Sequence, residues 1–160
     1  MTQEEDMIAT VKNLLTVSLL VCIPAVFSFA QSRVAGTVNF NGVQDKLWNL
    51  AEVRNGSTVI NIDRTNVKRD IYTIKFQKDR LIGAGAANAY FAPYTLGEDR
   101  VLSIGRIASS RLTASYEMKN FTERDYFMCL EKVDRWDLHD GKLELHTYDK
   151  NGAKVVLVFS

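Results

Sequence analysis

The sequence predicts an α+β fold, a single small domain in which a curved antiparallel β-sheet packs around one main α-helix. Three observations support this prediction. Short apolar segments with strand-like patterns recur along the chain, Asn-Gly and Asp-Gly dipeptides separate several of them, and a single segment has convincing helical periodicity. The order of several strands, one helix and three further strands is typical of one sheet packed against a helix.

The strands expected before the helix follow short alternating or apolar runs. In chain order they cover residues 46–53, 58–62, 70–76, 81–83, 90–95 and 101–107. Asn55-Gly56 is a strong hairpin signal between the first two. Residues 31–45, before these strands, are polar and interrupted by Gly and Asn, and we expect a linker or an early edge strand there.

The helix is expected to begin at Thr122. Thr122 and Asp125 have the spacing of a capping box, and Tyr126, Leu130 and their neighbours form an apolar stripe at helical spacing. Three strands are expected after it, at 136–138, 143–148 and 154–159, with turns at Asp140-Gly141 and Asn151-Gly152.

The first thirty residues differ in kind from the rest. An uncharged apolar run occupies residues 14–30, follows Lys12 and ends in small residues at Ala30, which is typical of a secretory signal peptide. Acidic residues at positions 4–6 do not suit such a signal, and Met7 is a possible true start. We therefore expect a signal peptide at 1–30, a linker or edge strand at 31–45 and one domain at 46–160.

The main alternative to cleavage is a leader that is retained as an anchor. A membrane-spanning helix needs about 20 apolar residues, and this shorter run is interrupted by Pro24. A lipid anchor on Cys22 is disfavoured because large residues precede it. Cleavage after Ala30 raises the net charge from +1 to +3, because one basic and three acidic residues are lost. Cys129 then remains alone, so the domain has no internal disulfide.

Composition and motifs argue against several classes of function. Hydrophobic residues at 46% and charged residues at 24% are typical of a globular protein, and the small net charge argues against a nucleic-acid binder. His139 and His146 lack the spacing of metal ligands, and Cys129 has no evident base beside it. The sequence contains no nucleophile elbow and no phosphate-binding loop. We expect no enzyme activity, no metal and no cofactor.

A glycine-rich stretch opens the segment that carries most of the identifiable pattern. It reads GAGAANAYFAPY from Gly83 to Tyr94, and its first five residues predict a tight, closely packed turn rather than a dinucleotide site. From Leu47 to Phe159 the chain resembles the META domain, the family of the heat-shock protein HslJ. The family signature Gly-x-x-Gly-Cys-Asn-x-aromatic-x-Gly-x-Tyr is matched by Gly83, Asn88, Tyr90 and Tyr94.

Two further patterns support the resemblance. Ile107 and Arg111 match a second signature, and Glu123 opens the family's helix pattern with Tyr126 and Leu130. Both signature cysteines fall on alanines, Ala87 and Ala114, so a thiol role of the signature is absent. Loss of both together suggests two positions that meet in space. The resemblance implies binding roles for Asn88, Tyr90, Tyr94, Arg111 and Glu123.

In physical terms, the signature residues suit structural roles. Asn88 can satisfy turn amides and tolerate left-handed backbone, and Gly83 permits close approach of neighbouring chain segments. Tyr90 and Tyr94 can fill core space while their hydroxyls find partners at its rim.

The resemblance implies a small envelope or secreted protein linked to stress tolerance and secretion, without an assigned reaction. We hypothesise an exported, periplasmic, outer-membrane-associated or secreted interaction or stress-protective module that contacts the membrane only through a retained leader. Its partner would be an envelope protein.

A second hypothesis is a binder of a small apolar or lipidic ligand in a cavity between the sheet and the helix. Its lining would be aromatic: Trp48, Phe76, Tyr90, Phe91 and Tyr94. A third and weaker hypothesis is a hydrolase that uses Glu123 or His146.

Overall fold

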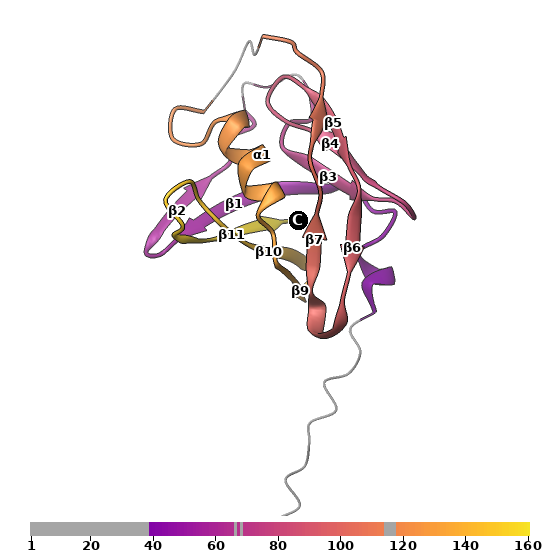
Figure 1. Ribbon diagram of the computed structural model, residues 1–160. Coiled ribbons are helices and arrows are strands. Elements are labelled where there is room, and N and C mark those ends of the chain that lie inside the picture. The colour runs from indigo at the N-terminus through magenta and orange to yellow at the C-terminus, as the bar shows by residue number, and fades with distance from the viewer. Residues whose placement is uncertain (1–38, 66, 68, 114–117) are drawn as a thin grey trace, which may run out of the picture. The chain divides into compact units, whose positions relative to one another are not determined.

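The structure, a computed structural model, describes residues 39–65, 67, 69–113 and 118–160 (Figure 1). The expected leader and residues 31–38 lie outside the described residues. The strands are β1 (Trp48–Asn55), β2 (Thr58–Asn61), β3 (Thr73–Phe76), β4 (Leu81–Ala84), β5 (Ala89–Ala92), β6 (Tyr94–Leu96), β7 (Leu102–Ile104), β8 (Ala108–Ser109), β9 (Arg135–His139), β10 (Lys142–Tyr148) and β11 (Lys154–Phe159). The described α-helix is α1 (Glu123–Glu131).

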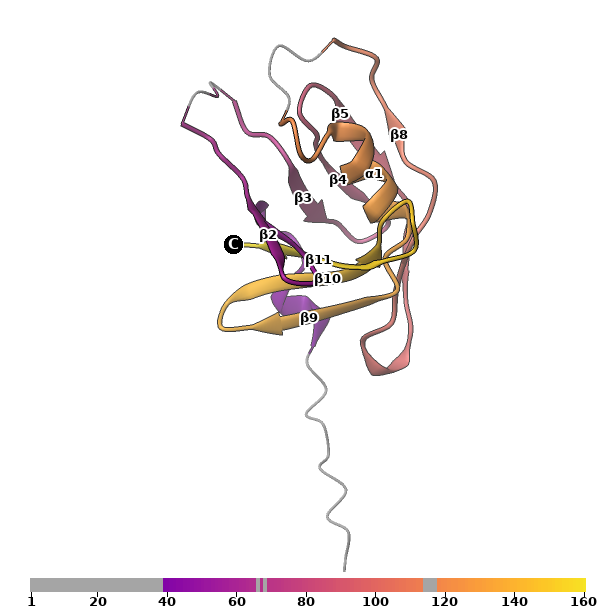
Figure 2. The ribbon, with the colours of Figure 1, turned by 90° about the vertical axis from the view of Figure 1, so that its left-hand side faces the viewer.

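One antiparallel sheet of nine strands dominates the described part of the chain. Its order is β8-β5-β4-β3-β1-β11-β10-β9, and β2 also pairs with β1. β1 joins two halves of the sheet, because its first residues pair with β3 and its last residues pair with β2 and β11. α1 lies against the inner face of this bent sheet, and β6 and β7 form a separate hairpin (Figures 1 and 2). The α+β fold with one sheet around one helix is therefore confirmed.

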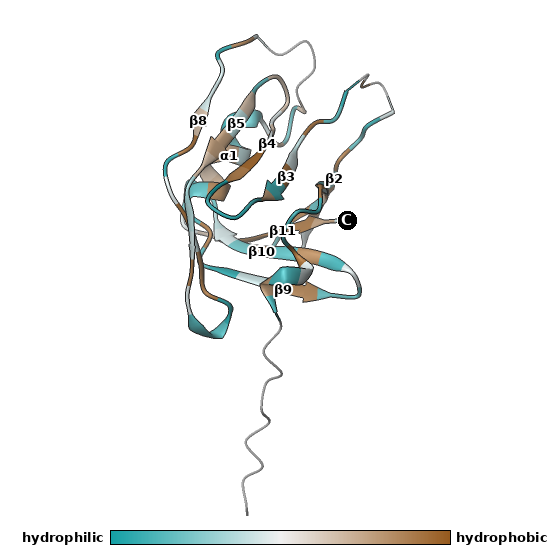
Figure 3. Ribbon diagram, turned by 90° about the vertical axis from the view of Figure 1, so that its right-hand side faces the viewer, coloured by the Kyte–Doolittle hydropathy of each residue, from teal (hydrophilic) through white to brown (hydrophobic). Residues whose placement is uncertain are grey.

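The core lies between the sheet and α1. Every second residue of β11, namely Val155, Leu157 and Phe159, faces inward and is buried. Tyr126 and Leu130 of α1 are fully buried against them and against the other half of the sheet. Figure 3 shows that the tip of the hairpin formed by β6 and β7, away from this core, is hydrophilic. Burial of this apolar surface is the main source of the domain's stability.

The start of α1 has the capping box that the sequence predicts. The Thr122 hydroxyl accepts a hydrogen bond from the Asp125 backbone N–H, and the Asp125 carboxylate accepts one from the Thr122 N–H at 3.0 Å. Two backbone N–H groups at the helix start, which have no acceptor within the helix, thereby receive one. In the part of the chain that the structure describes, no helix is long and apolar enough to span a membrane.

The segment before β1 differs from the expected linker or edge strand. Residues Phe40–Gly42 form a 3-10 helix, and the Phe40 ring packs edge-on against Phe76 and Trp136. Val43 is fully buried, and its carbonyl accepts a hydrogen bond from the Trp48 indole at 2.9 Å. Phe40 and Val43 thus anchor this otherwise polar and mostly exposed stretch to the core.

Three expected strands are shorter or divided. The strand expected at 70–76 begins only at 73, because Tyr72 has a left-handed backbone with φ of 51°. The expected strand 90–95 is divided into β5 and β6 at Pro93, which has no N–H to donate to a ladder. The expected strand 101–107 is shortened to β7, which pairs with β6, and the short strand β8, which pairs with β5, follows beyond the expected end.

Candidate functional site

The turn between β4 and β5 carries the most distinctive sequence pattern, and it packs against the start of α1. Its Gly85 N–H donates to the Asn88 carbonyl at 2.7 Å, which closes the turn. A side chain at Gly85 would overlap the Glu123 carboxylate, so the absence of a Cβ atom allows the helix to approach this closely. The prediction of a tight, closely packed turn is confirmed.

Glu123 lies in the first turn of α1, and its carboxylate accepts hydrogen bonds from N–H groups of the turn between β4 and β5. Its Oε1 accepts hydrogen bonds from the backbone N–H groups of Ala87 at 2.8 Å and Asn88 at 2.9 Å. Its Oε2 accepts a third from the Asn88 side-chain amide at 2.6 Å. The carboxylate also lies at the positive end of the helix, where a negative charge is stabilised.

Asn88 continues the network to a third segment. Its Oδ1 accepts hydrogen bonds from the Ser110 hydroxyl at 2.8 Å and the Leu112 N–H at 2.7 Å, and its Nδ2 also donates to the Leu112 carbonyl. We call residues 85–88, 110–112 and Glu123 the Glu123–Asn88 junction. The expectation that Asn88 satisfies amides of its own turn with left-handed geometry is wrong. Glu123 accepts the hydrogen bonds of those amides instead, and the backbone of Asn88 does not have a positive φ.

Tyr90 lies in the core beside the junction. Its hydroxyl donates to the Thr73 carbonyl at 2.8 Å and lies 2.9 Å from the Tyr126 hydroxyl. Burial is the largest cause that raises the pKa of both tyrosines above the ordinary value of 10.0. A Cβ atom at Gly83 would lie 2.7 Å from the Tyr90 hydroxyl, so Gly83 permits the close approach that we expected. Tyr90 therefore fills the core as a buried, neutral side chain.

The other two predicted site residues lie apart from this contact. Tyr94 lies on β6, outside the nine-stranded sheet, and its hydroxyl donates to the Gln77 carbonyl at 2.7 Å and accepts from Gln44 at 3.1 Å. Arg111 belongs to the 110–112 segment of the junction, but its side chain is exposed and no described residue holds it by a hydrogen bond or ion pair. Ala87 is buried next to Glu123, whereas Ala114 lies outside the described residues, so the expected meeting of the two alanines stays a prediction.

The remaining groups with chemical potential are separate from the junction. Burial, with the charges of Asp125 and Asp149, raises the pKa of the Cys129 thiol to about 11. His139 is exposed, and its Nε2 lies 3.1 Å from Asp140, whereas His146 is half-buried on β10. Within the described ranges, no three His, Cys, Asp or Glu side chains converge as metal ligands. Because its pKa is raised, the Cys129 thiol is a poor nucleophile at neutral pH.

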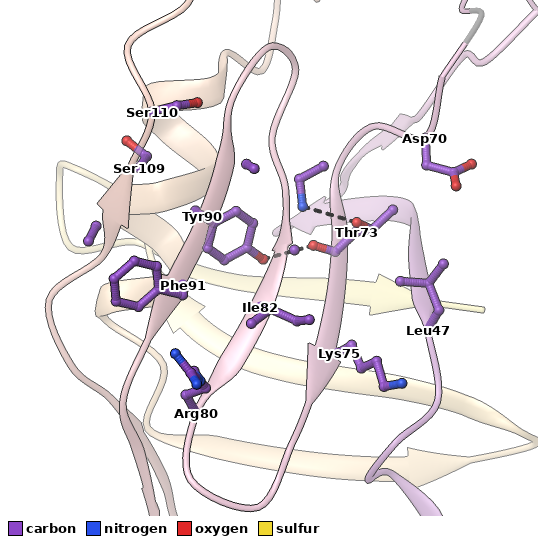
Figure 4. Close-up of a pocket in the computed structure, with 14 residues that line it drawn as sticks. Leu47, Asp70, Thr73, Lys75, Arg80, Ile82, Tyr90, Phe91, Ser109 and Ser110 are labelled. Carbon is purple, nitrogen blue, oxygen red and sulfur yellow. Dashed lines mark hydrogen bonds between the residues drawn. The ribbon is translucent and has the colours of Figure 1, made fainter.

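A groove of about 730 Å³ lies on the outer face of β3, β4, β5 and β8 (Figure 4). Phe91 is 50% exposed there, whereas Trp48, Phe76 and Tyr90 are buried in the core. The expected aromatic cavity is therefore wrong in its lining, because adjacent residues of one strand face opposite sides of the sheet. The run Ala89-Tyr90-Phe91-Ala92 contains this information, since two successive aromatics in a strand cannot both face inward.

A smaller cleft of about 180 Å³ lies between α1 and the other half of the sheet. Apolar side chains make up much of its wall, and Asp125, Asp149 and Lys150 stand among its polar lining. The apolar lining comes from Val53, Ile60, Phe121, Met128, Cys129 and Val155.

The fold and the junction together define a class of protein: a small α+β domain whose glycine-rich β-turn is bonded to the first turn of its helix. The sequence model of the META domain matches residues 41–159, and the chain belongs to this family. A solved NMR structure of a protein from Burkholderia xenovorans is similar, with a TM-score of 0.55 and 19% identity over 74% of this chain and 83% of that chain. At this identity the likeness shows the fold alone. No curated protein matches the sequence.

Proposed function

We propose that this META-domain protein is an exported, non-enzymatic interaction or stress-protective module of the cell envelope. The observation that supports this most is the contrast between the Glu123–Asn88 junction and the outer groove. The signature residues Asn88 and Glu123 are engaged in bonding within the fold, whereas the outer groove presents Phe91 to solvent. An exposed aromatic side chain beside other apolar residues is typical of an interaction surface.

Several contacts favour a non-enzymatic function. The Glu123 carboxylate accepts three N–H donors, which suits an anchor of the turn better than a general base. The buried Cys129 thiol has a raised pKa, and His146 lies on a different element from Glu123. The hydrolase hypothesis therefore has little support, and substitution of Glu123 and His146 without loss of any screened activity would dispose of it.

The proposed compartment rests on the sequence of residues 1–30. An uncharged apolar run that ends in small residues favours export, with the mature domain periplasmic, associated with the outer membrane or secreted. Sequencing the amino terminus of the protein that accumulates in cells tests this step. A terminus at Gln31 supports cleavage, and an intact Met1 contradicts it.

The groove can be tested in living cells. A photoreactive phenylalanine analogue in place of Phe91 would cross-link to any protein that docks there. The same analogue in place of Val59 is a matched control, because Val59 is also 50% exposed but lies on β2. We expect a discrete cross-linked product from position 91 and none from position 59. Absence of a product at position 91, with no stress sensitivity on deletion of the gene, would overturn the proposal.

A small apolar or lipidic ligand is a second candidate partner. The cleft between α1 and the sheet favours it, because Phe121 and Met128 contribute apolar walls. Its volume of about 180 Å³ is below the roughly 300 Å³ at which drug-sized ligand sites begin, which is why we place this function second. Native mass spectrometry of the purified protein should then show an added mass, and the bare chain mass would exclude the ligand.

A further inference from the structure

The outer face of the groove consists of two parallel rows of side chains, which follow from the strand register. The first row, which we call the ridge, contains successive cross-strand partners from β3 to β8: Lys75, Ile82, Phe91 and Ala108. The second, which we call the hollow row, lies two residues further along each strand: Thr73, Ala84 and Ala89. The rows are about 7 Å apart, and neighbouring strands are about 4.8 Å apart.

The two rows differ in height. Phe91 and Ile82 stand above the surface, whereas the hollow row holds no side chain larger than threonine. Figure 4 shows Phe91 and Ile82 on one side of this floor, and the floor itself is part of the groove of about 730 Å³. A ridge and a hollow therefore lie side by side on one surface.

Such a surface is complementary to itself under one rotation. A two-fold axis in the plane of the interface, perpendicular to the strands and between the rows, places the ridge of one copy on the hollow row of another. Ile82 then faces Ala84 of the second copy on β4, and Phe91 faces Ala89 of the second copy on β5. An axis parallel to the strands would instead stack ridge on ridge and leave both hollows unfilled.

The charges that line the groove agree with the first rotation. Lys75 ends the ridge on β3, and Asp70 lies beyond the hollow row in the segment that leads into β3. Figure 4 shows both residues on the same side of the groove and at opposite ends of it. The rotation therefore brings Lys75 of each copy toward Asp70 of the other.

We infer that the outer groove docks a second copy of this chain in a two-fold, face-to-face dimer. This inference rests on the proposed function, because it names the partner of the same groove. Fourteen residues line the groove, whereas a typical stable interface has about 20–30 on each side. The dimer is accordingly weak, with a Kd on the order of 10–100 µM.

Sedimentation velocity tests the dimer on the protein purified after expression of the full chain. Between about 1 µM and about 500 µM, the wild type should pass from monomer to dimer. Phe91→Ser removes the largest apolar side chain of the ridge and Ala89→Trp fills the hollow row, and each should raise the Kd at least tenfold. Val59→Ser, an exposed apolar residue outside the groove, should leave the Kd unchanged.

The pairing of Lys75 with Asp70 of the second copy gives a second test, because a nonspecific change of surface charge would not be reversed by exchanging the two residues. K75D and D70K should each weaken the dimer, because like charges then face each other, and the K75D/D70K double variant should restore it. Asp70 also lies in the field of Arg64, so far-UV circular dichroism must show that each variant is folded.

Two results would overturn the inference: a monomer at all concentrations, or a dimer that survives both Phe91→Ser and Ala89→Trp. The cross-linking in cells separates this failure from that of the proposed function. A product of twice the chain mass at position 91 supports the dimer, and a product with another protein alone supports the function and refutes the dimer. Absence of any product at that position counts against both.

Discussion

The Glu123→Ala variant tests whether the junction stabilises the fold. Removal of the carboxylate leaves the backbone N–H groups of Ala87 and Asn88 without an acceptor, and both residues are more than nine-tenths buried. An unsatisfied buried donor costs about 1–3 kcal/mol. Water can reach the half-buried Glu123 position and recover part of this loss, so we expect a total destabilisation of about 3 kcal/mol.

Urea unfolding followed by tryptophan fluorescence measures this loss, because Trp48 and Trp136 are both buried in the core. For a domain of this size, about 3 kcal/mol corresponds to a fall in Tm of about 10 °C. Glu123→Gln retains an acceptor for the backbone donors but places its own amide donors against the Asn88 amide. Its cost should therefore be smaller, about 1–2 kcal/mol.

Arg124→Ala is the matched control, because Arg124 is the next residue of α1 and is exposed. It should change the free energy of unfolding by about 0.5 kcal/mol or less. The reasoning is refuted if Glu123→Ala costs less than about 1 kcal/mol, or no more than Arg124→Ala.

Three further predictions concern the core. Gly83→Ala should lower the free energy of unfolding in urea by about 3 kcal/mol or more, because the new methyl group overlaps neighbouring atoms. The control Gly141→Ala, in open space with φ of 73°, should lower it by about 1 kcal/mol. Equal losses would contradict this prediction. Cys129 should react with a thiol reagent at pH 8 at least tenfold more slowly in the native than in the urea-unfolded protein, because its raised pKa of about 11 leaves little thiolate. The free energy of unfolding should fall above pH 10: the raised pKa values of Tyr90 and Tyr126 give stability that is complete below the ordinary value of 10.0 and is lost as pH rises through the folded values. Absorbance at 295 nm should show them ionising only with unfolding, and ionisation in the native state would refute the assignment.

Local signals in the sequence were sufficient for most of the secondary structure. The α1 start depends on two side chains three residues apart, and the Asn-Gly and Asp-Gly turns at residues 55–56, 140–141 and 151–152 need only their own backbone preferences. The turn glycines at these sites all have positive φ, as their turn types require.

Features that depend on distant partners were not predictable in this way. Tyr72 takes a left-handed backbone because its hydroxyl, its N–H and its ring are all held by remote segments. Phe40 enters the core from a polar stretch because Phe76 and Trp136 offer ring contacts there. No local pattern reports either arrangement.

The site was predicted only in part for the same reason. The family pattern pointed to Asn88 and Glu123, but 35 positions separate them, and their bonding became evident only in the fold. The aromatic character of Phe91 predicts an inner cavity, but the alternation of β5 turns its side chain to the outer face of the sheet. Its exposure makes it the central residue of the proposed docking surface.

The central claim is that the outer groove carries the interaction, whereas the junction carries stability. A photoreactive residue at Ile82, which lines the groove, tests it most directly when combined with Phe91→Ser or Asn88→Ala in living cells. We predict that Phe91→Ser abolishes the cross-link without lowering the free energy of unfolding, whereas Asn88→Ala lowers that free energy but keeps the cross-link in the protein that remains folded. A cross-link that survives Phe91→Ser, or is lost in folded Asn88→Ala, would contradict the account.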